Sequence, residues 1–261
     1  MLITLNGRPP VQAQIDAAEP GRAALASGET AALADITALA VPDSLRTIDG
    51  TASIGLVNTG GNTQVSSLRL DGNLTARAGD HRYTATAAIT RADDQGVESA
   101  RSWSTGIKYD RFVTPKLFLN ANTILTSDQF RDLQLRTALG AGVGYQVIDA
   151  PRVTLTADTG LGFVNENLGG QPGDRYAAGR ESATLSVFLL PDRVELFHEH
   201  DTYVGVTGTD NLFVKTQNGV RFMLAAGFIT TIRHDLDSDR SPAAGRRQTD
   251  RTFAVTLGYS F

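Results

Sequence analysis

Hydrophobic and polar positions alternate one for one along most of this chain. In residues 133–147 the odd positions, from Leu133 to Val147, are mostly apolar, and the even positions carry glycine, glutamine, alanine and arginine. Residues 67–77 and 153–163 repeat the pattern. A period of two is typical of a β-strand with one apolar face. These runs exceed the roughly 5–6 residues of an ordinary strand and suit a tilted strand that crosses a bilayer in about 9–11 residues.

The pattern predicts twelve strands. We place them near residues 51–59, 64–78, 81–92, 99–113, 116–127, 132–148, 152–164, 175–190, 193–205, 211–224, 227–237 and 248–261. Tight connections alternate with longer, polar ones such as 93–98, 165–174 and 238–247. An even strand number, with short turns at one end and long loops at the other, is typical of bacterial outer-membrane barrels. We therefore predict an all-β fold: a transmembrane antiparallel up-and-down β-barrel.

The first 49 residues have a different character. Residues 10–40 are rich in alanine, leucine, glutamate and glutamine, which predicts a short helical N-terminal segment that is periplasmic or caps the lumen. The predicted domains are therefore 1–49 and a barrel over 50–261. Met1 to Leu5 is too short for the apolar core of a secretory signal, so we expect a processed, truncated or mis-started N-terminus.

The last strand alternates strictly and ends on an aromatic residue. Its apolar positions are Phe253, Val255, Leu257, Tyr259 and Phe261. A closing strand must present one face to lipid while it pairs with the first strand, which requires this alternation. We interpret these five residues as an assembly signal for the barrel assembly machinery. The plainer interpretation is an amphipathic terminal strand of a soluble barrel or sandwich.

Composition narrows the remaining possibilities. The chain of 261 residues has no cysteine, which excludes disulfides, a thiol nucleophile and cysteine-based zinc sites. No run approaches the roughly 20 apolar residues of a membrane helix. With a net charge of −4, nucleic acid is not an expected partner. We expect no cofactor and no metal.

Charged residues fall on the polar face of the predicted strands. Because charge at the lipid face costs about 2–4 kcal/mol for Arg or Lys at mid-membrane, we expect these side chains to point into the lumen. Nine are basic and six are acidic: Arg69, Asp71, Arg77, Arg82, Lys108, Asp110, Arg136, Asp158, Arg180, Glu195, Glu199, Asp201, Lys215, Arg221 and Arg233. The mixture predicts ion pairs across a narrow interior. It favours either a partly filled, stabilising lumen or a narrow path in which Arg136 and Arg221 oppose Glu199 and Asp201.

Two other sets of residues suggest chemistry. His198 and His200 share one face of a strand and are placed to chelate a metal, but no third ligand is nearby. An outer-membrane phospholipase-like hydrolase would need a serine paired with a histidine on the outer surface. Ser182 and Ser186 are predicted to face inward without such a partner, so we predict that the chain is not an enzyme.

Several short motifs of the barrel region occur in a fixed order. They are Thr59-Gly60-Gly61-Asn62-Thr63, Lys108-Tyr109-Asp110-Arg111-Phe112, Arg136 with Gly140, Gly142, Gly144 and Tyr145, and Thr249-Asp250 followed by Leu257 to Phe261. With these motifs the chain resembles the salt-induced outer membrane protein family over about residues 50–261. This resemblance implies an outer-membrane barrel with a link to salt or osmotic stress. The resemblance implies no catalytic residue.

These observations predict a monomeric barrel of the Gram-negative outer membrane that acts as a narrow passive channel. The alternatives are a structural or adhesion-type barrel without transport and, third, a membrane-active hydrolase. Expected partners are outer-membrane lipid, lipopolysaccharide and, during biogenesis, the barrel assembly machinery. The segment Asp235 to Asp250 is expected to be a loop that contacts lipopolysaccharide phosphates through arginine or divalent cations through aspartate.

Overall fold

The computed structural model describes residues 2–5, 11–15, 22–25, 30–32, 36–40, 47–58, 65–170, 172–206 and 210–261. The chain divides into two units between Thr47 and Ile48. The second unit is a closed barrel of twelve antiparallel strands, as predicted. Its strands are β6 (Thr47–Asn58), β7 (Val65–Ala78), β8 (His81–Asp94), β9 (Val97–Phe112), β10 (Leu117–Asp128), β11 (Leu133–Ala150), β12 (Val153–Leu168), β13 (Asp174–Leu190), β14 (Val194–Gly205), β15 (Leu212–Met223), β16 (Phe228–Asp239) and β17 (Thr249–Ser260).

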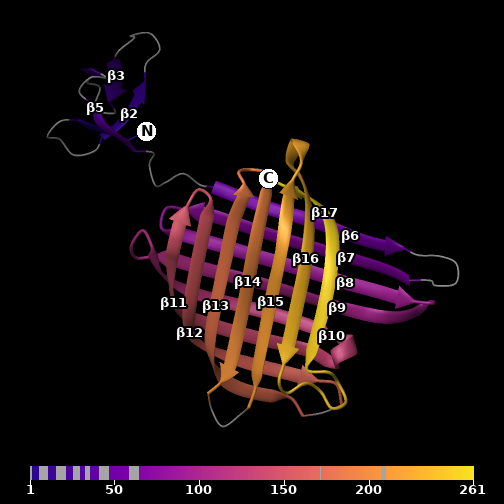
Figure 1. Ribbon diagram of the computed structural model, residues 1–261. Helices are drawn as coiled ribbons and strands as arrows, with labels where there is room; N and C mark the ends of the chain where they lie inside the picture. The colour runs from indigo at the N-terminus through magenta and orange to yellow at the C-terminus, as the bar shows by residue number, and fades with distance from the viewer. Residues whose placement is uncertain are drawn as a thin grey trace. The chain divides into compact units, whose positions relative to one another are not determined.

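Each barrel strand lies beside its neighbours in the sequence, and the last strand pairs with the first. Leu257 is opposite Ile54 and Ser260 is opposite Thr51. Beyond this register, the amide of Gly50 donates to the carbonyl of Phe261 at 2.8 Å. In Figure 1 the strands at the front and at the back of the barrel cross at an angle, which reflects their tilt. Closure leaves no exposed strand edge, which is the condition for a sheet to stand in lipid.

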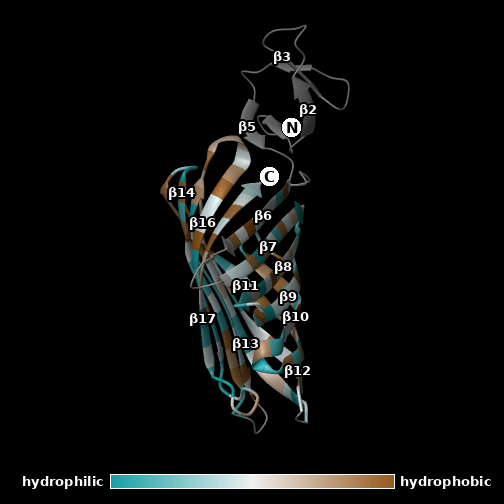
Figure 2. Ribbon diagram, turned by 90° about the vertical axis from the view of Figure 1, so that its right-hand side faces the viewer, coloured by the Kyte–Doolittle hydropathy of each residue, from teal (hydrophilic) through white to brown (hydrophobic). Residues whose placement is uncertain are grey.

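The exterior of the barrel carries the apolar half of each alternating strand. Leu161 on β12 and Phe253 on β17 are 72% and 70% exposed, and every strand from β6 to β17 has an exposed large apolar residue. Figure 2 shows hydrophobic and hydrophilic residues following one another along the strands. The aromatic residues Tyr83, Trp103 and Tyr145 are also exposed. An apolar surface on this scale is unusual for a water-soluble monomer and normal for one that faces lipid.

The strand connections differ in length between the two ends of the barrel. We call the end with residues 79–80, 113–116, 151–152, 191–193 and 224–227 the turn end, and the opposite end the loop end. The loop end includes residues 169–173 and 240–248. The sequence predicted a long connection at 93–98, and this prediction is wrong. β8 and β9 are joined by the two-residue turn Gln95-Gly96, in which both residues have positive φ, as a tight hairpin turn requires.

Two single-turn 3₁₀ helices complete the barrel unit. They are η2 (Gln129–Arg131), between β10 and β11, and η3 (Ala225–Gly227), between β15 and β16. The Asp128 carboxylate caps η2 by accepting from the amides of Phe130 and Arg131. None of the helices in the described ranges has the length and hydropathy of a membrane-crossing helix.

The N-terminal unit corrects one prediction. Its described residues form strands β1 (Leu2–Leu5), β2 (Val11–Ile15), β3 (Arg22–Leu25), β4 (Thr30–Ala32) and β5 (Ile36–Ala40), in the sheet order β4-β3-β2-β1-β5. The expected helices are therefore wrong for these residues. Helix-forming composition is a weak guide, and prolines and glycines cut this segment into pieces shorter than the roughly 12 residues that a helix needs. Within β2, apolar residues occupy every second position, as in a strand.

Candidate functional site in the barrel lumen

The barrel interior collects charged side chains, as the sequence predicts. The inner face of the strands carries basic and acidic groups that are mostly engaged with one another. One closed ring joins β7 and β16. Arg69 contacts Asp71 at 3.0 Å and Asp235 at 2.7 Å, while Arg233 contacts Asp71 at 2.9 Å and Asp235 at 2.9 Å. Each guanidinium therefore lies between two carboxylates, which offsets the cost of removing these charges from bulk water.

A second network crosses from β9 to β14. Asp158 on β12 accepts from Arg180 on β13 and from Lys108 on β9, the latter at 2.5 Å. Arg180 also reaches Asp201 on β14 at 2.7 Å. Asp110 on β9 is fully buried and pairs with Arg82 at 2.7 Å. Predicted lumen residues from the five strands β8, β9, β12, β13 and β14 thus meet in a single network.

A third network contains residues that the sequence analysis placed in loops. Arg136 on β11 donates to Glu166 at 2.7 Å and to Asp239, and all three side chains are buried. The hydroxyl of Tyr176 donates to the Glu166 carboxylate at 3.1 Å. Glu166 was expected in a loop, but β12 extends to Leu168. Asp239, beyond the predicted strand 227–237, lies on β16 together with Asp235 and Asp237. In both places the residues past the predicted strand end are nearly all polar, so the apolar alternation stops before the strand does and gave no signal for the extra residues.

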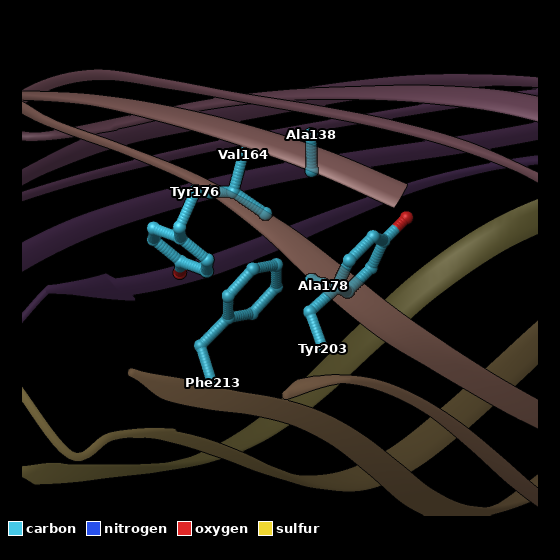
Figure 3. Packing of buried hydrophobic residues seen from close by; sticks show 6 residues of the cluster. All are labelled: Ala138, Val164, Tyr176, Ala178, Tyr203 and Phe213. Carbon is cyan, nitrogen blue, oxygen red and sulfur yellow. The ribbon is translucent and has the colours of Figure 1, made fainter. Parts of the chain in front are cut away.

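One wall of the lumen is filled by large side chains. We call the inner face of β10–β15 the packed wall. Its apolar cluster consists of Ala138, Val164, Tyr176, Ala178, Tyr203 and Phe213. Figure 3 shows the rings of Tyr176, Phe213 and Tyr203 gathered together, and the rings of Tyr203 and Phe213 stack at 4.7 Å. The guanidinium of Arg136 lies 4.6 Å from the Phe213 ring centroid, so the charge network and the cluster form one packed body.

Glycines on β11 and β12 make room for these rings. A Cβ at Gly144 would lie 2.2 Å from the ring of Phe118, and a Cβ at Gly162 would lie 3.1 Å from the ring of Tyr203. The glycines of the predicted sixth strand are therefore needed for close approach inside the lumen. Small and large residues interdigitate on this wall, and little space remains between them.

The facing wall is lined by small polar residues. We call the inner face of β6–β9, β16 and β17 the open wall; it includes Ser53, Thr86, Ala88, Ser104 and Thr256. Three cavities lie along the lumen beside it. A loop-end cavity of about 470 Å³ reaches Asp128 and Asp250, and a central cavity of about 320 Å³ reaches Thr51 and Arg221. A turn-end cavity of about 360 Å³ reaches Arg82 and Thr184.

The three cavities adjoin one another in series. The loop-end and central cavities share Ser104 and Lys215, and the central and turn-end cavities share Thr86, Glu199 and Asp201. Because neighbouring cavities share these mostly polar lining residues, together they form a polar route along most of the lumen. Arg82, which lines the turn-end cavity, and Arg77 stack over the ring of Phe112 at 5.1 and 4.6 Å.

Glu199 stands out among the lumen charges. It lines both the central and the turn-end cavity, and it is an exposed residue although it lies on the inner face. It makes no salt bridge within the described ranges, whereas its neighbour on the inner face, Glu195, pairs with Arg221 at 2.5 Å. A carboxylate that is not neutralised by a close cation attracts cations to its part of the lumen.

The predicted four-residue constriction forms only in part. Glu199, Asp201 and Arg221 line the central cavity, but Arg136 lies in the buried network with Glu166 and Asp239. Lys215 lines the central cavity and lies 4.0 Å from Asp237.

Ion pairs also bridge opposite walls at the loop end. β10 and β16 are six places apart in the twelve-strand order and therefore lie across the lumen from each other. Arg131, in η2 after β10, contacts Asp237 on β16 at 2.6 Å and Asp250 on β17 at 3.3 Å. Arg136 crosses similarly from β11 to Asp239. These ion pairs link the packed wall to the open wall at the loop end.

The candidate catalytic and metal residues take structural partners. Ser182 is buried on the inner face, and Ser186 donates to Glu195 at 2.7 Å, in agreement with the predicted inward orientation. His198 and His200 lie on the outer face and bond to each other at 3.0 Å. Within the described ranges no group of three or more metal-ligating side chains occurs.

The closing strand is oriented as predicted. Phe253, Val255, Leu257, Tyr259 and Phe261 are all exposed on the outside of the barrel. The rings of Tyr259 and Phe228 make an edge contact at 5.8 Å. These residues belong to the lipid-facing surface at the seam where the barrel closes.

A closed antiparallel barrel with an apolar exterior and a charged interior defines a membrane-spanning β-barrel. The model of the family described as "Protein of unknown function, DUF481" matches residues 52–261, and the chain belongs to that family. None of the curated proteins matches the chain.

Solved structures with a similar fold include the NanC porin, at 8% identity and a TM-score of 0.48, covering 82% of this chain and 99% of that one. Another is the translocator domain of the autotransporter NalP from Neisseria meningitidis, at 16% identity and a TM-score of 0.40, covering 83% and 88%. A third is the outer membrane channel DcaP of Acinetobacter baumannii, at 9% identity and a TM-score of 0.39, covering 83% and 95%.

Proposed function

We propose that this protein is a narrow, passive outer-membrane channel for small ions and polar solutes. The observation that carries the proposal is the series of three adjoining cavities between the open wall and the strands that face it, joined at Ser104, Lys215, Glu199 and Asp201. Polar lining replaces part of the hydration of a passing ion, and ion pairs around the path hold the wall in shape. Large solutes are excluded because the packed wall fills the rest of the lumen.

Glu199 is the residue proposed to set the ion preference. Its carboxylate faces the junction of two cavities and lacks a close cation among the described residues, so cations are favoured over anions there. Asp201 lies on the same face, but its negative charge is neutralised by the ion pair with Arg180. The charge of Glu199 is therefore more available to a passing ion than that of Asp201.

Planar-bilayer recording of the refolded chain tests this proposal. The wild type is expected to give small conductance steps and a reversal potential of cation-selective sign in a KCl gradient. Glu199→Gln is expected to shift that potential toward zero while the steps persist. The matched control is Asp149→Asn, which removes a carboxylate from an exposed position near the turn end of β11 that lines none of the three cavities, and which leaves the potential unchanged.

The absence of steps above background in correctly folded wild-type barrels would contradict transport and favour the alternative of a structural or adhesion-type barrel. A folded barrel is recognised by its heat-modifiable mobility on gels. This control separates a lack of conduction from a failure to fold.

We also propose residence in a lipopolysaccharide-containing outer membrane, with assembly by the barrel assembly machinery. The exposed apolar positions of β17 support this proposal because they lie on the lipid side of the closing seam. Phe261→Ala is expected to lower the amount of heat-modifiable barrel in the outer-membrane fraction, with little effect on refolding into detergent. Equal membrane levels of both proteins would contradict an assembly role for the terminal aromatic residue.

A link to salt or osmotic stress is proposed from the resemblance of the barrel region to the salt-induced family. The cation path proposed past Glu199 fits this link, because such a path would change the permeability of the envelope to cations. Deletion of the gene should alter growth at raised salt, and wild type but not Glu199→Gln should restore it. Indifference of the deletion strain to salt would contradict the role.

A further inference from the structure

A row of polar side chains interrupts the apolar exterior of the barrel over β13–β16. It consists of Glu181 on β13, His198 and His200 on β14, Asn218 on β15 and His234 on β16. Alternation places all of them outward, because their sequence neighbours Arg180, Phe197, Asp201, Gln217 and Arg233 line the interior. Register confirms their proximity: His198 is opposite Asn218, which is opposite His234. We call this set the outer polar row.

Apolar residues flank the outer polar row toward both ends of the strands. Leu185 and Val187 follow Glu181 toward the turn end of β13, and Leu161 and Phe163 on β12 lie toward the loop end from it. On β15 and β16, Val220 and Ile232 adjoin the row on its turn-end side. The row is therefore inside the apolar belt. Ionisable groups in such a position are unfavourable in lipid and are usually covered by a polar partner.

Four of the five side chains form one hydrogen-bonded chain. His198 Nδ1 lies 2.6 Å from Asn218 Oδ1, His198 Nε2 lies 3.0 Å from His200 Nδ1, and His200 Nε2 lies 3.0 Å from Glu181 Oε1. Both nitrogens of each imidazole are engaged, so neither ring is available to deprotonate a nucleophile. This arrangement argues against a hydrolase centre on the exterior.

The hydrogen-bonded chain has a direction. With Asn218 Oδ1 as the acceptor, His198 donates to it and His200 donates to His198, so the last link shares one proton between His200 and Glu181. The second carboxylate oxygen of Glu181 remains as an acceptor at the β13 end. The amide NH₂ of Asn218 and the ring of His234 remain as donors toward the β16 end. Glu181 is 56% exposed, so its acceptor is accessible.

We propose that the outer polar row is the interface for a second copy of this chain within the membrane. A two-fold axis along the membrane normal, passing near β14 and β15, sets β13 of one copy against β16 of the other. It thereby brings the Glu181 acceptor of each copy to the donors of Asn218 and His234 in its partner. Such self-complementarity is the requirement of an isologous dimer interface. The inference rests on the membrane placement proposed above and differs from the monomer that the sequence led us to expect.

Cysteine cross-linking in native outer membranes tests the interface, because the chain has no cysteine of its own. Val220→Cys places a thiol on β15 beside the row without removing any of its members. Leu119→Cys is the matched control, an exposed apolar position on β10, five strands away. Oxidation is expected to yield disulfide-linked homodimers of Val220→Cys several-fold above the level of Leu119→Cys.

The second arm of the cross-linking experiment combines Glu181→Leu with Val220→Cys. Loss of the acceptor is expected to lower cross-linking to the control level, while the barrel itself stays folded because a leucine is favourable in lipid. Membrane fractionation and heat-modifiable mobility are measured on every variant, so a failure of membrane placement is recognised separately. Equal cross-linking of Val220→Cys and Leu119→Cys, insensitivity to Glu181→Leu, or linkage to a different protein would overturn the proposal.

Discussion

The two walls of the lumen are built from the same alternating strands but differ in what fills them. On the packed wall the glycines of β11 and β12 lie against large rings such as Phe118 and Tyr203, so the side chains interdigitate. On the open wall, small residues such as Ser53, Ala88 and Ser104 face one another, and cavities remain between them. An alternating strand pattern therefore decides that a barrel has an interior. The pairing of small with large or small with small residues decides whether that interior is closed.

The charge networks divide in the same way. The Arg136 network is buried within the packed wall, whereas Glu199 and Lys215 are in contact with the cavities. A buried charge is held by its partners and stabilises the barrel only while they are complete. A charge that lines a cavity interacts with the ions or solutes that enter that cavity. The comparison therefore predicts that substitutions of buried, tightly packed lumen residues change stability and that substitutions of cavity-lining residues change conduction.

Breaking the Arg136 network should have the largest effect on stability. Arg136→Leu leaves the buried Glu166 and Asp239 without their cation, and loss of one partner of a buried pair costs about 3–5 kcal/mol. The free energy of unfolding, measured by urea titration in detergent micelles, is expected to fall by that amount. Adding Glu166→Gln and Asp239→Asn should restore much of it. An unchanged unfolding curve for the single variant would contradict the role given to this network.

Adding one methyl group should have the second-largest effect on stability, and the effect should differ between the packed wall and the open wall. Gly144→Ala places a Cβ against the ring of Phe118, and overpacking of this kind costs about 1–3 kcal/mol. Gly106→Ala on β9 is the control, because its Cβ would meet the hydroxyl of Thr86, which can rotate away. Phe118→Leu is expected to rescue Gly144→Ala. Equal unfolding free energies for the two alanine variants would remove the distinction between the walls.

Filling the open wall should change conduction more than stability. Ala88→Phe adds a ring where the loop-end and central cavities meet, so it occupies space without displacing packed atoms. The unfolding free energy is expected to change by less than about 1 kcal/mol. Most of the single-channel conductance should be lost. Full conductance in Ala88→Phe would show that ions do not pass along this wall.

The smallest effect is expected at the loop end. A hydrogen bond of 2.6 Å from Arg246 holds the pKa of the exposed Asp132 carboxyl below its ordinary value of 3.8. The interaction is therefore present at neutral pH and is lost as the pH falls through the acidic range. Arg246→Gln should increase protease access to residues 240–248 at neutral pH while leaving the unfolding curve unchanged. Wild-type and variant loops should become alike at low pH, and a persistent difference there would contradict this ion pair.

The sequence by itself determined the number of strands, their order and the two faces of each. Strict alternation allows only one assignment of outside and inside, so Leu161 and Phe253 were correctly predicted outward and Arg180 and Asp158 inward. It also determined that the inner charges are mixed in sign. The strands that contain Glu166 and Asp239 were predicted too short, because the residues at their ends are polar on both faces and the apolar alternation stops before the strand does.

The tertiary structure alone decided which charges meet. Arg131 and Asp237 are separated by about a hundred residues and come together only because β10 and β16 lie across a closed barrel. The same closure puts Glu199 beside a cavity and leaves Arg136 in a packed cluster, although both residues follow the same inward pattern. Alternation specifies a direction for each side chain but not a partner. Partners depend on curvature, register and the sizes of neighbouring residues, which are properties of the assembled barrel.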